Sequence, residues 1–107
     1  MVLIETPAFT RLITGLLGDD TYRRFQARLA ANPGLGDLIP GGGGIRKARV
    51  GFGGKGKRGG ARVIYYWAVR KDLILLLYVY PKIVQADLSR TQIVQLARVV
   101  KSEFGDE

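Results

Sequence analysis

The sequence predicts a small α+β fold in which a curved antiparallel sheet packs on helices. Three observations lead to this prediction: two amphipathic helical segments lie before residue 34, β-branched and apolar runs fill residues 45–80, and another amphipathic segment ends the chain. The 107 residues, 47% hydrophobic and 24% charged, suffice for one core of two packed layers. We therefore expect one domain over residues 1–107, in the order strand, helix, helix, three-strand meander, helix.

The first third of the chain supplies the predicted strand and helical hairpin. Residues 1–5 have a strand composition, and Thr6 then caps a helix that begins at Pro7, where a missing N–H does no harm. An aspartate in the break at 18–20 is expected to cap a second helix, which ends at the Asn-Pro-Gly of 32–34. One apolar face of this hairpin should cover the sheet.

The middle of the chain is expected to form three antiparallel strands. Residues 45–52 alternate cationic with apolar side chains, as in a half-exposed strand, and the glycine-rich 53–60 follows as a hairpin loop. Residues 61–69 are β-branched and aromatic, and 73–80 are apolar throughout, as in a strand covered on both faces. The core is expected to be one face of this sheet packed on the helices.

The last segment has the pattern of a helix with a defined start. Ser89 and Gln92 have the spacing of a capping box, in which each side chain bonds the backbone N–H of the other. The apolar stripe that follows consists of Ile93, Leu96, Ala97, Val100 and Phe104.

Composition excludes several classes of function. The chain has no cysteine and no histidine, which excludes disulfides and thiolate zinc sites and removes the commonest metal ligand and general base. We expect no metal and no other cofactor. The longest apolar run, residues 73–81, is too short to span a bilayer, and the start of the chain lacks the features of a signal peptide. A cytoplasmic protein without a membrane partner is the simplest expectation.

The charge of the chain favours a polyanionic partner. Seventeen Lys and Arg against nine Asp and Glu give a net charge of +8, and nine of the basic residues lie between Asp37 and Asp72 with no acid among them. Surfaces charged only for solubility mix both signs, so this block indicates a field directed at an anion, first of all nucleic acid. An acidic protein or an anionic membrane surface would also be attracted by this positive charge.

The stretch GFGGKGKRGG at 51–60 superficially resembles a nucleotide-binding loop. Arg58 stands where the phosphate-loop pattern needs Ser or Thr, and a strand follows where that motif opens a helix. Its glycine pattern also occurs in protein kinases, but the chain has none of the other kinase motifs. We interpret it as a flexible cationic hairpin tip.

Strand parity predicts a cluster of cations beside this tip. Side chains two residues apart share a face, so the core set is Ala48, Val50, Phe52, Val63, Tyr65, Trp67 and Val69. The opposite face then carries Lys47 and Arg49 on one strand, and Arg62, Ile64 and Tyr66 on the next. A hairpin register with residue 49 opposite residue 62 would bring the three cations together, a repulsion best explained by a bound phosphate.

Two longer stretches resemble a known family. LAANPGLGDLIPGGGGIRKARVGFGGKGKRGGARVIYYW (29–67) and LYVYPKIVQADLS (77–89) are similar to the RelE/HigB superfamily of bacterial type II toxin–antitoxin toxins, in particular its HigB-like branch. The resemblance implies a RelE-like fold and a metal-independent, ribosome-dependent mRNA endoribonuclease that cuts the message in the decoding site. It also implies a cognate antitoxin with a helix-turn-helix, through which alone the toxin would meet operator DNA.

The resemblance implies roles for individual residues. Catalytic roles are expected for Lys47, Arg49, Arg62 and Lys82, which would stabilise the phosphate as the 2′-hydroxyl attacks it. RNA-binding roles are expected for Arg46, Lys55, Lys57 and Arg58. Tyr66 and Tyr80 are possible proton donors or base-stacking platforms.

The sequence leaves open the identity of the general base and two other readings of the function. The family's catalytic His or Tyr near the C-terminus has no counterpart here, so the general base is undetermined, with Lys47 or Lys57 as candidates. A basic RNA-binding or ribosome-binding module without chemistry would carry the same charge. A structural protein charged for solubility is a weaker third reading.

Overall fold

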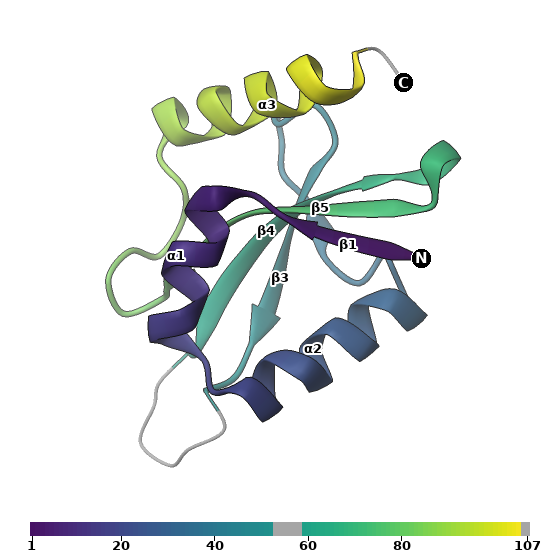
Figure 1. Cartoon of the computed structure of the whole chain (residues 1–107). Coiled ribbons are helices and arrows are strands. Elements are labelled where there is room, and N and C mark those ends of the chain that lie inside the picture. Colours follow the sequence, from purple (N-terminus) through teal and green to yellow (C-terminus); the bar gives the residue numbers. More distant parts are fainter. Residues whose placement is uncertain (53–58, 106–107) are drawn as a thin grey trace.

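The computed structural model describes residues 1–52 and 59–105, in which helices and strands follow the predicted order (Figure 1). The helices are α1 (Pro7–Leu16), α2 (Asp19–Ala31) and α3 (Arg90–Phe104). The strands are β1 (Val2–Glu5), β2 (Asp37–Leu38), β3 (Ile45–Val50), β4 (Ala61–Ala68) and β5 (Leu73–Pro81). A 3₁₀ turn at Val69–Lys71 joins β4 to β5.

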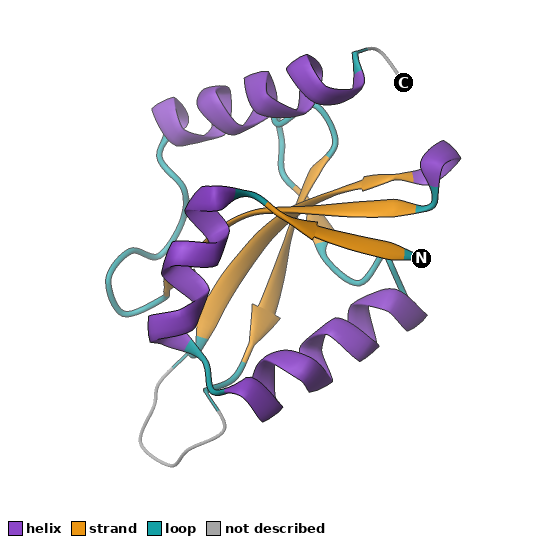
Figure 2. Ribbon diagram, in the orientation of Figure 1, coloured by secondary structure: helices purple, strands orange, loops and turns teal. Residues whose placement is uncertain are grey.

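Five strands form one twisted sheet in the order β1-β5-β4-β3-β2 (Figure 2). The meander β3-β4-β5 is antiparallel as predicted, and the two-residue β2 adds to its edge. The sheet is mixed rather than wholly antiparallel, because β1 pairs with β5 in parallel. Hairpins force antiparallel pairing only between strands that they join, and β1 is separated from β5 by both helices and the other strands.

The helix starts follow the local sequence, with one correction. The Thr6 hydroxyl accepts a hydrogen bond from the Phe9 N–H at 3.1 Å, and Ser89 and Gln92 form the predicted capping box. The N-cap of α2 is Gly18, not an aspartate, and no side chain caps this helix. Asp19 and Asp20 instead lie in its first turn, where their negative charges interact favourably with the helix dipole.

Apolar side chains pack on both faces of the sheet, so the prediction of a core on one face alone is wrong. One core joins α1 and α2 to the face that carries Val63 and Tyr65, as strand parity predicts. The other joins α3 to Ile45, Ile64 and Leu77. Strand β5 is covered on both sides, as its apolar sequence predicts. Val69 leaves the predicted core set, because β4 ends at Ala68 and the side chain of Val69 is 60% exposed.

A register shift between β4 and β5 determines on which face of the sheet the last side chains of β5 lie. Ile64 pairs with Tyr78 and Tyr65 pairs with Leu76, which leaves Leu77 as the extra residue of a bulge. Leu77 and Tyr78 consequently join the same core, on the side of α3. The shift brings Tyr80 opposite Arg62 on that face.

No helix among residues 1–52 and 59–105 combines the length and the apolar character that crossing a membrane would require.

Candidate functional site

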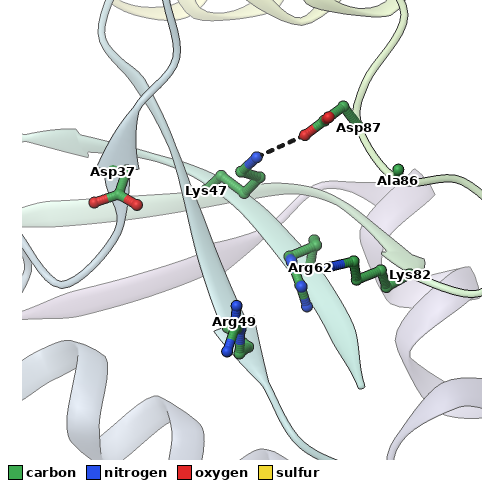
Figure 3. Close-up of a pocket in the computed structure, with 7 residues that line it drawn as sticks. All are labelled: Asp37, Lys47, Arg49, Arg62, Lys82, Ala86 and Asp87. Atoms are coloured by element: carbon green, nitrogen blue, oxygen red, sulfur yellow. Dashed lines mark hydrogen bonds and ion pairs between the residues drawn. The ribbon is translucent and has the colours of Figure 1, made fainter. Parts of the chain in front are cut away.

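A pocket of about 280 Å³ opens beside the β3–β4 hairpin, where the segment that follows β5 passes over the sheet (Figure 3). Its walls come from β2, β3, β4 and the connection to α3. The lining residues are Asp37, Lys47, Arg49, Arg62, Lys82, Ala86 and Asp87.

The pocket collects the four cations to which the sequence assigns catalytic roles: Lys47, Arg49, Arg62 and Lys82. Arg49 pairs directly with Arg62 across the two strands, which is the register that the cation cluster requires. Asp37 and Asp87 are the acidic residues of the lining, so cations outnumber carboxylates by four to two. The pocket therefore has a positive field that suits an anion.

Arg62 is the most deeply placed of these cations, with 5% of its surface exposed. Its Nη1 donates hydrogen bonds to the carbonyl oxygens of Gly59 at 2.6 Å and Ala61 at 3.2 Å. Within the described ranges it forms no ion pair with a carboxylate. Carbonyl oxygens satisfy hydrogen bonds of the guanidinium but do not neutralise its charge. Because a buried charge without a counterion is costly, the binding of an anion beside Arg62 is favourable.

Lys47 is engaged by a neighbour that the sequence analysis does not identify. Its Nζ donates to the Asp87 carboxylate at 2.8 Å, across 40 positions of sequence (Figure 3). The hydrogen bond and the charge of Lys47 lower the pKa of Asp87, and the charges of Lys82 and Arg62 add to this. Asp87 is consequently ionised at neutral pH and stands at the pocket as a fixed acceptor.

Tyr80 lies opposite Arg62 on β5 with its hydroxyl buried. That hydroxyl has no hydrogen-bond partner in the described part of the chain. Burial raises the pKa of Tyr80, and the negative charge of Asp87 raises it further, so the phenol stays protonated at neutral pH. Because only 2% of the surface of Tyr80 is exposed, its ring is not accessible for base stacking.

Asp37 reaches the pocket because the loop before β2 is anchored from the other face of the sheet. The Tyr65 hydroxyl accepts from the Gly36 N–H at 2.8 Å and donates to the Pro33 carbonyl at 2.7 Å. Arg46 pairs with Tyr65, on that same face, and donates to the Gly36 carbonyl at 2.8 Å. Arg46 is thus away from the pocket and fixes the loop, so its position gives no support to the RNA-binding role predicted for it.

The other predicted residues lie elsewhere. The Tyr66 ring packs against Phe104 of α3, with 5.2 Å between ring centroids, and lines a separate pocket beside that helix. Lys55, Lys57 and Arg58 lie outside the described residues, so their RNA contacts stay predictions. In the described part of the chain, no three His, Cys, Asp or Glu side chains gather as a metal site.

Comparison with known proteins identifies the family. The model of the RelE toxin of the RelE/RelB toxin–antitoxin system matches residues 23–105. The chain belongs to the RelE toxin family. The match spans the meander, the pocket and α3, so the site of this RelE-family toxin lies inside the region that defines the family.

Two solved structures share the fold of this RelE-family toxin. A variant of the E. coli toxin RelE with two arginines replaced by alanine, in the free state, has a TM-score of 0.60 at 14% identity, over 88% of this chain and 94% of that one. A chain of the intact E. coli RelBE toxin–antitoxin complex has a TM-score of 0.52 at 14% identity, over 73% and 92%.

The site of this RelE-family toxin has two acidic members that sequence reasoning missed. Asp87 lies within the stretch 77–89 that carries the family resemblance, so its presence there was a usable signal. Asp37 lies within the other such stretch, 29–67, but the two-residue strand that brings it to the pocket has no signature in the sequence.

Proposed function

We propose that this RelE-family toxin is a ribosome-dependent endoribonuclease that cuts mRNA in the decoding site and so stops translation. The observation that carries the proposal is Arg62, a buried cation without a carboxylate partner in the described residues, among three further cations. Fixed positive charges of this kind stabilise the additional negative charge that a phosphodiester acquires during attack.

The proposed reaction uses the message's own 2′-hydroxyl as nucleophile. Its oxygen attacks the adjacent phosphorus, the bond to the 5′-oxygen breaks, and a 2′,3′-cyclic phosphate remains on the upstream fragment. Arg62 and Arg49 would bind the non-bridging oxygens, whose charge grows in the transition state. No metal is needed for these steps, because the guanidinium groups supply the positive charge.

Two proton transfers complete the reaction. The Nζ of Lys47 already donates to the Asp87 carboxylate, so the proposal does not use Lys47 as the general base. The proposal gives this role to Asp87, whose carboxylate can accept the proton of the 2′-hydroxyl. Lys82, exposed at the same pocket, would donate a proton to the departing 5′-oxygen.

The proposal includes an antitoxin. Family membership and the likeness to a chain of the RelBE complex support a protein partner that neutralises the toxin. Acidic side chains on that partner would compete with RNA for the pocket cations. Control of operator DNA would then come from the antitoxin, which we expect to carry the helix-turn-helix.

Cleavage of mRNA on programmed ribosomes tests the proposal. The intact protein should yield fragments that end in a 2′,3′-cyclic phosphate, and Arg62→Ala should lower the cleavage rate at least about 100-fold, as loss of one transition-state stabiliser does. Asp87→Asn should lower kcat, because the amide cannot accept a proton.

The control is Arg24→Ala, which removes an exposed arginine of α2 and should leave the rate unchanged. Circular dichroism of each variant would verify that it is folded. Ribosome binding without any cut message would contradict the nuclease and indicate the non-catalytic module. Full activity in Arg62→Ala would remove Arg62 from the site.

A further inference from the structure

A second, apolar groove of about 380 Å³ adjoins the cationic pocket. It shares Asp37, Lys47 and Asp87 with that pocket. The rest of its wall is Leu38, Ile39, Pro40, Leu88 and Ile93. Leu38 is 59% exposed there, so an apolar surface stands uncovered directly beside a site built for an anion.

We propose that this groove binds the nucleobase next to the phosphate held in the cationic pocket, and that Asp37 makes it selective for guanine. The inference rests on the proposed nuclease function and adds the substrate's base to it. In a nucleotide a flat, largely apolar ring is joined to the charged phosphate through one sugar. Two adjoining cavities, one cationic and one apolar, match that pair of groups, and base-binding surfaces in RNA-binding proteins are of this kind.

Asp37 supplies the selectivity. Its side chain is exposed and makes no hydrogen bond or ion pair within the described residues. A carboxylate only accepts hydrogen bonds, and the Watson–Crick edge of guanine offers two neighbouring donors, N1–H and the 2-amino group. Adenine and cytosine offer one amino donor there, and uracil one imino donor. The paired, charge-assisted contact with guanine is the strongest of these.

The position of Asp37 is rigid enough for such discrimination. Its backbone pairs with Lys47 of β3, and the loop before it is held by Tyr65 and Arg46. Adding a Cβ at Gly36 would place that atom 2.9 Å from both the Lys47 carbonyl oxygen and the Tyr65 ring, so this close approach needs glycine. The carboxylate is therefore presented from a fixed edge of the sheet.

The charges around the groove favour RNA over the antitoxin as its occupant. A partner that neutralises the basic pocket is expected to bring acidic side chains. In the groove those side chains would meet Asp37 and Asp87, which line it. A base carries no negative charge and gains from the same carboxylates.

Titration of the ¹⁵N-labelled full chain with 3′-GMP, 3′-AMP, 3′-UMP and inorganic phosphate tests the proposal without requiring cleavage. We expect 3′-GMP to shift the amide signals of Leu38, Ile39, Leu88 and Ile93 and to bind at least about fivefold more tightly than 3′-AMP. Asp37→Asn should abolish that preference without weakening phosphate binding, because the substitution removes a negative charge that also lines the cationic pocket. Leu38→Asn should weaken all three nucleotides at least about fivefold and not phosphate.

Val69→Asn is the matched control for Leu38→Asn, since both side chains are about 60% exposed and Val69 lies in the turn before β5. It should bind every ligand as the unmodified protein does. Equal affinity for 3′-GMP and 3′-AMP would overturn the guanine site. So would a Leu38→Asn variant that loses affinity for the antitoxin and for no nucleotide, because the groove would then be an antitoxin surface.

Cleavage of programmed ribosomes separates this proposal from the proposed function. Guanine-selective binding without cleavage would support the base site and contradict the nuclease. Cleavage that is equally fast beside every base, in the unmodified protein and in Asp37→Asn alike, would support the nuclease and overturn the base site.

Discussion

Arg62 and Lys47 differ in what an arriving phosphate would gain from each. Arg62 is buried, and its hydrogen-bond acceptors in the described part of the chain are backbone carbonyls. A phosphate would therefore supply the negative counterion that this guanidinium lacks there. Lys47 already has Asp87 at 2.8 Å, and a phosphate must compete with that carboxylate. The first residue is thus suited to hold the anion, and the second to respond to its arrival by releasing Asp87.

A prediction at the residue scale concerns the unpartnered hydroxyl of Tyr80. Tyr80→Phe should leave the free energy of unfolding unchanged or raise it by about 1 kcal/mol, because among residues 1–52 and 59–105 the hydroxyl has no hydrogen-bond partner to lose. Because this oxygen is buried, we also expect the cleavage rate to fall less than about tenfold. Urea denaturation and cleavage on programmed ribosomes measure the two effects.

Tyr22→Phe is the control for Tyr80→Phe, because the Tyr22 hydroxyl does have a partner. It donates to Glu5 at 2.6 Å, and its removal should cost about 1 kcal/mol or more. A Tyr80→Phe variant that keeps its stability and loses cleavage 100-fold would restore the proton-donor role considered for Tyr80. A loss of stability would mean that the hydroxyl is hydrogen-bonded in solution.

At the scale of elements, the alternation of side chains along a strand predicts which face of the sheet each residue occupies. It does not predict where that alternation is interrupted. The parity of residues 45–50 and 61–67 correctly puts Val63 and Tyr65 on the face opposite Arg62, and it permits the pairing of Arg49 with Arg62 without fixing it. The bulge at Leu77 and the two-residue β2 depend on long-range packing and have no local signature. Tyr80 and Asp37 are positioned by these two features, so their places could not be derived from sequence.

A prediction at this scale concerns the entry of the hairpin into β4. Gly60 has φ +57°, and a Cβ there would collide with the Val50 carbonyl oxygen across the β3–β4 ladder. Gly60→Ala should therefore lower the free energy of unfolding by about 2 kcal/mol or more. It should also reduce cleavage, because the neighbouring Gly59 carbonyl holds Arg62.

Gly15→Ala is the matched control for the hairpin prediction. Gly15 lies in α1 with nothing within 4 Å of an added Cβ, so alanine should raise the free energy of unfolding by about 0.5–1 kcal/mol. Thermal unfolding of the two variants should give shifts of Tm in opposite directions. A stabilised Gly60→Ala would mean that the hairpin adopts another conformation in solution.

At the scale of the whole molecule, the two faces of the sheet have different tasks. One face of the sheet packs against α1 and α2, and the other packs against α3 (Figure 1). The cationic pocket lies on the side of α3, and its lining does not include that helix. The basic block of the sequence predicted part of this field, because three of its charges, Lys47, Arg49 and Arg62, lie on adjacent strands and line the pocket. Asp87 could not be placed in that way, since it lies 40 positions from Lys47 and meets it only through the tertiary fold.

The last prediction concerns whether the affinity for RNA depends on the net charge of +8 or on the cations of the pocket. Arg49→Gln with Lys82→Gln removes two exposed pocket cations, whereas Arg24→Gln with Arg28→Gln removes two exposed cations of α2. Both double variants have a net charge of +6, since 8 − 2 = 6. Their long-range attraction to a polyanion is therefore matched, and any difference in affinity reflects where the charges lie.

We expect the pocket pair alone to lose at least about tenfold in affinity for ribosomes at physiological salt, and to flatten the slope of log K against log salt by about 2. The α2 pair should change affinity less than about twofold, because its side chains do not line the pocket. Binding measured between about 50 and 200 mM salt gives both quantities. Equal losses in the two variants would mean that total charge governs the encounter, and a slope unchanged in both would mean that neither pair contacts phosphate.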